Sequence, residues 1–255
     1  MVPLQLKAPD WVRISDEAPH RSTAFRHATL HQRPGLWGDH AERPTSALWL
    51  REGSPGTWEA FGAGRASPSV GWLDGRSAGL PITLLAPPSW EGPVRLLGGR
   101  VETRTIRTMK RLESATPPIP SHKIRARPLT LADRAAFEAA APSWALRSWG
   151  DFAAMLAGGL AYGVPDSGGL ASLGWTYESD QEHDKIGVST EPRFRQLGLG
   201  RAVASALVEA ILRERRKSLL WVTTPENSAS LALAVSLGFA AEVDETLLRW
   251  IRESV

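Results

Sequence analysis

The sequence predicts an α/β fold, a mixed sheet flanked by helices in its second half, from three observations. Residues 185–190 form a short apolar run that breaks into a glycine-containing basic turn, and a helical pattern follows the turn. Residues 218–224 form a second apolar, β-rich run that ends at Pro225. Residues 227–239 read as a short apolar helix that ends at a Gly-Phe pair. Strands that alternate with helices in this way are typical of α/β domains.

The basic turn, residues 195–200, reads Arg-Gln-Leu-Gly-Leu-Gly. A strand, an amide-rich turn and a helix N-terminus together can bind an anion. The turn lacks the G-x-G-x-x-G of a dinucleotide-binding loop and the Lys-Ser/Thr pair of a P-loop. Apolar residues recur behind the turn at near-helical spacing, so we expect it to be fixed against a core; these residues are Leu199, Val203, Leu207, Ala210 and Ile211.

The pattern Arg-x-x-Gly-x-Gly, with Arg193 and Arg201 on either side, resembles the pyrophosphate-binding loop of the GCN5-related N-acetyltransferases (GNATs), which hold acetyl-coenzyme A. Residues 227–239 look like the family's N-x-x-A/S-x-x-L-Y-x-x-x-G-F segment. The two blocks stand about thirty residues apart, which suits the family's crossover unit. The resemblance covers residues 122–255 and implies a GNAT-type fold: a mixed, splayed central sheet flanked by helices.

The remaining elements of the second half follow the family's order. Thr130, with Asp133 three residues later, predicts the cap of a first helix. Ser148 and Asp151 repeat this spacing before a second helix, which Gly158 and the next glycine end. The second helix is expected at residues 152–156 and the strands at residues 124–129, 160–164, 169–177, 185–190, 218–224 and 246–251.

The resemblance implies that two strands splay apart and that the pantetheine arm of acetyl-coenzyme A lies between them like an added strand. Residues 188–190 would offer backbone groups to that arm, residues 195–201 would bind the pyrophosphate, and Asn227 would hydrogen-bond the arm. The arginines would add positive charge at the helix terminus. The residues expected at the coenzyme are Val188, Ser189, Thr190, Arg193, Arg195, Gln196, Leu197, Gly198, Leu199, Gly200, Arg201, Asn227 and Ser230.

Acetyl transfer to an amine calls for a general base, because an alkyl ammonium with a pKa of about 10.4 is almost wholly protonated at neutral pH. The acidic cluster before residue 185 supplies the candidates Glu178, Glu182 and Asp184, with His183 beside them. The same cluster is also typical of a solvated hairpin loop.

The acid that protonates the departing thiolate is the second open point. The family's frequent acid is a Tyr seven residues after the motif Asn, and this sequence has Ala234 there. Direct departure of the thiolate, or proton donation by water, Ser230, Ser236 or Tyr177, is the alternative.

A proline-dense segment, residues 116–121, predicts a domain boundary, since it can continue neither a helix nor a central strand. We therefore divide the chain into residues 1–121, an N-terminal α+β domain, and residues 122–255, the GNAT acetyltransferase domain. Residues 1–121 hold 14 of the 19 prolines and six of the 11 tryptophans. The tryptophans suit a core or a groove for an apolar acceptor. By analogy with tandem acetyltransferases, we expect a degenerate GNAT-like half that binds the acceptor or a partner.

Composition excludes several classes of site and partner. Without cysteine there are no disulfides, thiolate metal sites or Cys nucleophile. His27 and His31 are four residues apart but lack the H-E-x-x-H pattern, so no metal is expected. The net charge of +3 without a long Lys/Arg run argues against nucleic acid. No window is apolar enough for a membrane span, and we expect a cytoplasmic protein. Residues 62–64 and 98–99 are expected to be turns.

The predicted function is an N-acetyltransferase that moves an acetyl group from acetyl-coenzyme A to an amine of a small molecule or peptide by direct attack. The alternative is a catalytically silent acyl-coenzyme A-binding sensor or interaction module, which Ala234 and the unassigned base favour. The acceptor, the acyl-chain preference and the oligomeric state stay open, because the residues that face them come from loops with no fixed motif.

Overall fold

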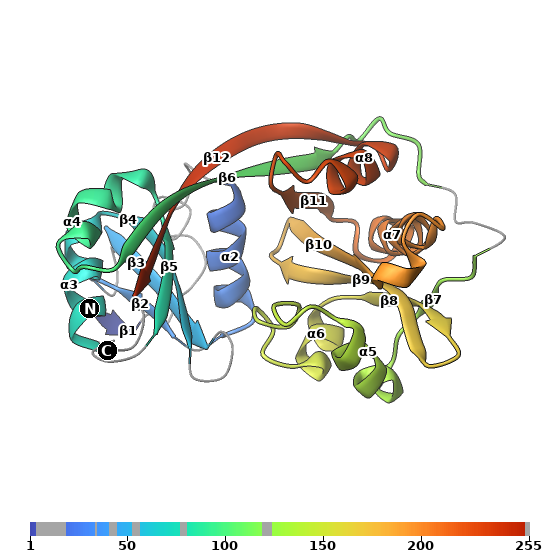
Figure 1. Cartoon of the computed structure of the whole chain (residues 1–255), viewed down its shortest axis with the longest axis horizontal. Coiled ribbons are helices and arrows are strands. Elements are labelled where there is room, and N and C mark those ends of the chain that lie inside the picture. The colour runs from blue at the N-terminus through green and yellow to red at the C-terminus, as the bar shows by residue number, and fades with distance from the viewer. Residues whose placement is uncertain are drawn as a thin grey trace. The chain divides into compact units, whose positions relative to one another are not determined.

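The computed structural model describes residues 1–3, 19–33, 35–40, 45–52, 57–76, 81–118 and 124–252. The chain forms two compact units, residues 1–106 with 244–255, and residues 107–243. Two long strands, β6 (Arg100–Arg111) and β12 (Phe239–Arg252), belong partly to each unit (Figure 1). The boundary expected between residues 121 and 122 falls inside the second unit, and residues 119–121 of the proline-dense segment lie outside the described residues.

The first unit is an α+β structure with the strand order β1-β2-β3-β4-β5-β12. Its neighbouring strands are antiparallel except for the parallel pair β4 and β5. Its elements are β1 (Val2–Pro3), α2 (Pro19–Leu30), β2 (Leu36–Gly38), β3 (Ser46–Glu52), β4 (Trp58–Gly64), α3 (Ala66–Arg76), β5 (Ile82–Ala86), the 3₁₀ turn η2 (Pro88–Trp90) and α4 (Glu91–Arg95).

Tryptophans build much of the first unit's core, as one of the two readings predicted. Trp49 and Trp90 are almost fully buried, whereas Trp11 lies outside the described residues. The turn expected at residues 62–64 is wrong, because these residues complete β4. A Cβ on Gly62 would lie 2.6 Å from the Trp90 ring, so the glycine lets that ring pack on the strand. The turn at residues 98–99 is confirmed, with positive φ at both glycines.

The second unit follows the predicted element order, and its strand order is β12-β6-β11-β10-β9-β8-β7. The pair β10 and β11 is parallel, and the pairs β6–β11, β9–β10, β8–β9 and β7–β8 are antiparallel. Its elements are β7 (Arg127–Pro128), the 3₁₀ turn η3 (Leu131–Asp133), α5 (Arg134–Ala140), α6 (Phe152–Gly158), β8 (Ala161–Asp166), β9 (Gly169–Ser179), β10 (His183–Thr190), the 3₁₀ turn η4 (Pro192–Phe194), α7 (Leu199–Ala210), the π-helical turn η5 (Ile211–Arg215), β11 (Ser218–Thr223) and α8 (Ser228–Ser236).

One of the two predicted helix caps is confirmed and the other is wrong in part. The backbone N–H of Thr130 donates to Asp133 Oδ2 at 2.8 Å, which is the expected capping interaction. At α6, Asp151 is itself the N-cap and accepts from the Ala154 N–H at 2.8 Å. Ser148 is buried and donates to Glu178 Oε1 at 2.9 Å instead. A buried carboxylate needs donors, and this need outweighs the local capping pattern.

The sheet of the second unit carries a different core on each face, because successive side chains of a strand point to opposite faces. On the α7 face, Ile186, Trp221 and Met109 pack with Leu207 of α7. On the opposite α5 face, the main cluster joins residues of β9 with α5 and α6; it includes Leu173, Trp175, Phe137, Phe152 and Met155.

Candidate functional site

The central feature of the second unit is a place where two parallel strands part. β10 pairs with β11 only from His183 to Ile186, whereas it pairs with β9 as far as Thr190. The last residues of β11 pair with β6 on its other side. Among the described residues, no strand therefore pairs with residues 187–190 of β10 on the side toward β11. We call this stretch the open edge; the predicted splay of the sheet is confirmed.

Hydrogen bonds to β9 reveal which backbone groups face the open edge. The Glu191 N–H donates to Ala171 O at 3.0 Å, and Ser172 Oγ donates to Ser189 O at 3.1 Å. Backbone groups of alternate residues point to the same side of a strand. Ser189 therefore turns its backbone groups toward β9, and Val188 and Thr190 turn theirs toward the open edge.

The turn after β10 has the geometry of an anion cradle. Gln196 and Gly198 have φ of 62° and 80°, and Gly198 is the N-cap of α7. The Ala202 N–H makes a helical hydrogen bond, to Gly198 O at 3.0 Å. The N–H groups of residues 199–201 precede it and have no partner within the helix. A Cβ on Gly200 would lie 3.1 Å from Thr190 Oγ1, so the helix start lies against the end of the open edge.

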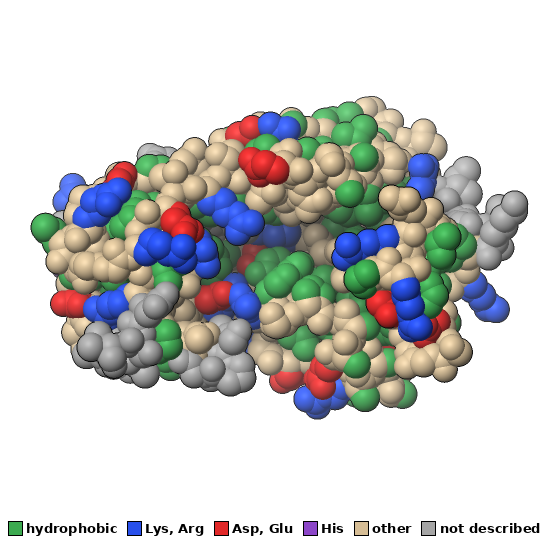
Figure 2. All heavy atoms as spheres, viewed as in Figure 1, with side chains coloured by type: hydrophobic (Ala, Val, Ile, Leu, Met, Phe, Trp, Pro, Cys, Tyr) green, Lys and Arg blue, Asp and Glu red, His purple; other side chains and the backbone are tan. Residues whose placement is uncertain are grey.

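The three predicted arginines differ in what they contact. Arg193 is ion-paired with Asp166 at 2.9 Å and with Glu191 at 2.7 Å. Arg195 donates from Nε to the Thr190 carbonyl at 3.3 Å. Arg201 is exposed and has no ion-pair partner within the described part of the chain. Figure 2 shows Lys and Arg side chains on the surface beside α7. Arg195 and Arg201 thus keep positive charge available at the turn.

The second predicted block begins at Asn227, which caps α8. Asn227 Oδ1 accepts from the Ser230 N–H at 3.2 Å, and Trp221 Nε1 donates to Ser230 Oγ at 2.9 Å. Because Trp221 is the last β11 residue paired with β10, Ser230 lies beside the point where the strands part. Ala234 is fully buried, and Ser236 Oγ donates to a carbonyl of its own helix at 2.7 Å.

The three candidate bases are not brought together. Glu178 is buried, and Lys185 Nζ lies 2.5 Å from its Oε2. Asp184 is buried and contacts Ser179 Oγ at 2.6 Å. It directly precedes Lys185 on β10, so its side chain lies on the opposite face of the sheet from that of Lys185. Glu182 lies in the turn between β9 and β10 with a side chain that is 77% exposed. Tyr177 packs edge-on against an exposed tryptophan of the loop before α6.

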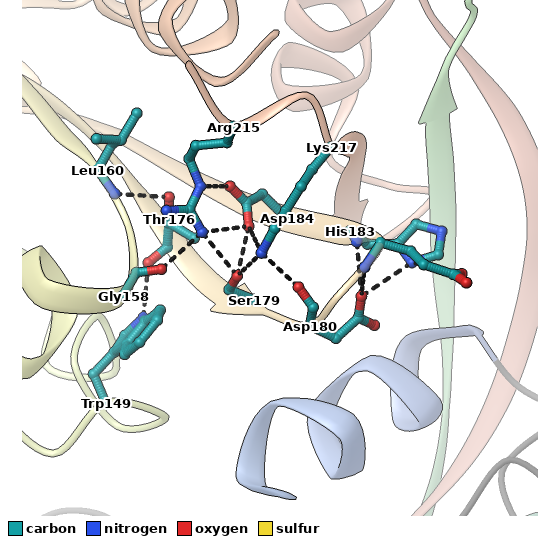
Figure 3. Close-up of polar contacts among 11 residues, drawn as sticks. Trp149, Gly158, Leu160, Thr176, Ser179, Asp180, His183, Asp184, Arg215 and Lys217 are labelled. Atoms are coloured by element: carbon teal, nitrogen blue, oxygen red, sulfur yellow. Dashed lines mark hydrogen bonds and ion pairs between the residues drawn. The ribbon is translucent and has the colours of Figure 1, made fainter. Parts of the chain in front are cut away.

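Asp184 belongs to a polar cluster that the sequence reasoning missed. Figure 3 shows Arg215 and Lys217 reaching Asp184 from the segment after α7. Arg215 also donates to Gly158 O at 2.7 Å, and Lys217 donates to Ser179 Oγ at 2.8 Å. The π-helical turn places Arg215 there, and the basic run at residues 213–217 was the available signal.

Within the described ranges, no group of three or more His, Cys, Asp or Glu side chains is arranged to hold a metal ion. The rings of His27 and His31 are tilted by 43° to each other, with 4.7 Å between their centroids. None of the helices in the part of the chain that the structure describes is long and apolar enough to cross a membrane.

Solved structures share this fold at low sequence identity. The GCN5-related N-acetyltransferase-like protein from Streptococcus suis is 22% identical, with a TM-score of 0.62 over 84% of this chain and 87% of that chain. A tandem GNAT protein from the clavulanic acid biosynthesis pathway is 15% identical, with a TM-score of 0.62 over 96% and 93%. The GCN5-related N-acetyltransferase from Sphaerobacter thermophilus is 17% identical, with a TM-score of 0.58 over 84% and 79%.

A family model matches the chain itself, although no curated protein sequence does. The GNAT acetyltransferase model matches residues 105–246, more than half of the chain. The matched region contains the parted strands, the amide-rich turn and the helix that Asn227 caps. It begins before the proline-dense segment and includes the end of β6, which lies between β12 and β11 in the sheet. The chain therefore belongs to the GNAT acetyltransferase family.

Proposed function

We propose that the protein transfers an acetyl group from acetyl-coenzyme A to an amine of a small molecule or peptide by direct attack. The observation that carries this proposal is the parting of β10 and β11 after Ile186 and Trp221, next to an amide-rich helix start. By analogy with the tandem GNAT relative, residues 1–121 are proposed to be a degenerate half that binds the acceptor or a partner. We further propose a cytoplasmic location, where acetyl-coenzyme A is available.

The residues at the open edge fit the coenzyme. Val188 and Thr190 would hydrogen-bond the pantetheine arm through their backbone groups, as a strand does with an added strand. The N–H groups of residues 199–201 and the charges of Arg195 and Arg201 would hold the diphosphate. Asn227 uses its oxygen for the cap, which leaves its Nδ2 as a donor toward the arm.

The coenzyme supplies a thioester carbonyl and a thiolate leaving group. An amine that attacks this carbonyl places negative charge on the carbonyl oxygen, and a fixed backbone donor can stabilise that charge. The N–H of Val188 faces the open edge one residue beyond Gly187, where the strands have just parted. We assign it as this donor.

The amine must lose a proton before it attacks. Glu178, Glu182 and Asp184 remain the proposed candidates. In the register of the sheet, Glu178 is the candidate nearest to the parting, since it pairs with Lys185, one residue before Ile186. Because its two oxygens already contact Lys185 and Ser148, it would act through a water molecule.

Ser230 is the proposed donor to the departing thiolate, in place of the tyrosine that Ala234 replaces. Its Oγ accepts a hydrogen bond from Trp221, so its own hydroxyl hydrogen points elsewhere. A thiolate needs little acid assistance, and one hydroxyl beside the parting is sufficient for this role.

The test is calorimetric binding of acetyl-coenzyme A together with thiol release in panels of small amines, aminoglycosides and peptides. We expect binding and release with at least one acceptor. Tight binding of acetyl-coenzyme A without thiol release in any panel would contradict the acetyltransferase activity and favour the silent acyl-coenzyme A binder. Ala234 and the ion-paired state of Glu178 and Asp184 speak for that second candidate. No binding at all would contradict both.

A further inference from the structure

The first unit contains a parting of two parallel strands like that of the second unit. β4 pairs with β5 only from Trp58 to Phe61, whereas it pairs with β3 as far as Gly64. Of the strands in the described ranges, none pairs with residues 62–64 on the side toward β5. We call this stretch the first-unit edge. The helix α3 follows it, as α7 follows the open edge of the second unit.

A hydrogen bond at the start of β4 shows which backbone groups face the first-unit edge. The Trp58 N–H donates at 2.9 Å to the carbonyl oxygen of Pro81, which directly precedes β5. Because the backbone groups of alternate residues point to the same side of a strand, Gly62 and Gly64 also turn theirs toward β5. These two glycines therefore correspond to the two residues of β10 that face the open edge.

The side chain of Trp90 lies against the first-unit edge. Its Nε1 donates to Gly64 O at 2.8 Å, and a Cβ on Gly62 would lie 2.6 Å from its ring. Trp90 is fully buried, in the cluster that contains Val70 and Leu73 of α3. A chain that added to this edge like a strand would need the Gly64 carbonyl and the space beside Gly62. Trp90 already occupies both.

Trp90 also stands at the place in the chain where the second unit has its capping asparagine. It follows the last residue of β5 by four positions, and Asn227 follows the last residue of β11 by four positions. The proposed function assigns Asn227 to the coenzyme arm. In the first unit, an indole that hydrogen-bonds its own unit's strand takes that place.

The first unit also lacks the amide-rich turn. Arg65 alone separates β4 from α3, whereas eight residues separate β10 from α7. The third residue of α3 is Pro68, which has no N–H to offer to an anion. In the second unit, the first three residues of α7 each have an N–H. The first unit therefore has neither the space for a coenzyme arm nor the turn for a diphosphate.

We propose that the first unit contains a closed coenzyme-type site, in which the indole of Trp90 takes the place of the pantetheine arm. Each chain then binds one acetyl-coenzyme A, in the second unit. This inference rests on the proposed function, which places the arm along the open edge. Backbone groups on an unpaired strand edge need a partner or water, and Trp90 supplies a partner from within the chain. The first unit is thus complete without the coenzyme.

The experiment follows two indole N–H signals, one at each parting, by heteronuclear NMR of the full chain during a titration with acetyl-coenzyme A. The Trp90 signal reports on the first-unit edge, and the Trp221 signal, from the donor to Ser230, reports on the open edge. Trp90→Phe and Trp221→Phe each remove one signal and so assign it. We expect calorimetry to give one coenzyme per chain. The coenzyme should shift the Trp221 signal and leave the Trp90 signal in place.

Hydrogen exchange of the same signals tests the closed site without any ligand. The buried Trp90 N–H, bonded to Gly64 O, should exchange at least about 100-fold more slowly than an exposed indole N–H. Fast exchange of the Trp90 signal, or a second coenzyme that shifts it, overturns the inference while the proposed function stands. If acetyl-coenzyme A shifts neither signal and releases no heat, the proposed function fails instead, and the assignment of a closed coenzyme-type site falls with it.

Discussion

The two ends of β10 differ in which groups they carry: buried charged side chains at the first end, and backbone groups that face the open edge at the second. At its first end, the buried charges of Asp184 and Lys185 have ion-pair partners, Arg215 and Glu178 among them. At its second end, Val188 and Thr190 face the open edge, and the turn that follows leads into the N–H groups of residues 199–201, which have no partner within α7. The first end anchors the strand to α7, α6 and β9. This anchored first end fixes the position of the backbone groups that the second, open end presents to a ligand.

Solvent explains why the open end tolerates its unpaired groups. Residues 188–190 are half-buried and residues 195–198 are exposed, so water can satisfy their N–H and C=O groups. Asp184 and Lys185 are at most 1% exposed, so their charges need protein partners. The difference teaches that stability and binding are separated along β10 by burial, and substitutions at each end should therefore have different effects.

The largest expected effect is at the anchored end. Asp184→Ala leaves Arg215 and Lys217 without their carboxylate, and loss of one partner of a buried pair costs about 3–5 kcal/mol. We expect urea denaturation to show a loss of this size in the free energy of unfolding. Glu182→Ala is the matched control, because that side chain is 77% exposed and should change the value by about 0.5 kcal/mol or less. Equal losses would remove the distinction between the two ends.

The second largest effect is expected at the turn after the open end, where a substitution should change the affinity for acetyl-coenzyme A. Gly198→Asp places a carboxylate beside the proposed diphosphate site and should weaken acetyl-coenzyme A binding by about 100-fold, or about 2.7 kcal/mol. Gly198→Asn is the control, since Asn has the same shape without the charge and tolerates the positive φ of 80°. Calorimetry that gave both variants the same affinity would contradict an anion at this turn.

A third substitution probes the point between the two ends. A Cβ at Gly187 would lie 2.7 Å from the Trp175 ring, which Ala145 O holds through Nε1 at 3.1 Å. Gly187→Ala should therefore lower the free energy of unfolding by about 1–3 kcal/mol, as overpacking does. Gly174→Ala on β9 is the control, because its Cβ would lie 3.4 Å from Leu207, an ordinary contact. A thermal scan in which the two variants melt together would mean that Trp175 moves aside.

The smallest effect comes from an exposed ion pair, which sharpens the contrast with Asp184. The Arg127 guanidinium, and then the Thr130 N–H, hold the pKa of Asp133 well below its ordinary value of 3.8. A lowered pKa stabilises the fold above about pH 4, and this contribution is lost as the pH falls further. Asp133→Asn should cost about 0.5–1 kcal/mol at neutral pH.

The check for Asp133 is the free energy of unfolding measured from pH 7 to pH 2. The difference between the wild type and Asp133→Asn should shrink as the pH falls below about 4. Glu138→Gln, at an exposed pair with Arg134, should show little effect over the same range. If the difference in the free energy of unfolding stays constant down to pH 2, the ionised Asp133 carboxylate is not the cause of the stabilisation.

Much of the second unit could be predicted because its signals are local. The Thr130 cap, the glycine turn before the helix that begins at Leu199 and the short helix after Asn227 each depend on a few neighbouring residues and were found where expected. Ser148 was misplaced because its partner, Glu178, is far away in the sequence. The local spacing to Asp151 carried no information about that buried carboxylate.

The candidate site was predicted only on its coenzyme side. The basic glycine turn and the Asn227 block have short motifs, whereas the surroundings of the acidic residues depend on burial. Glu178 and Asp184 sit on opposite faces, each with a cation, because the sheet brings Lys185 and Arg215 to them. The pattern of acidic residues near residue 180 could not show whether each carboxylate is buried with a cation or exposed in a loop.

The sequence by itself determined the strand, turn and helix around Gly198 and Gly200, since such motifs depend on φ preferences and hydrophobic spacing over a few residues. Only the tertiary structure decided that β6 lies beside β11 and which arginines already have carboxylate partners. Strand pairing between distant segments and the burial of charge depend on how the whole chain packs. The local spacing of apolar and polar residues therefore predicts neither the strand pairing nor the burial of charge.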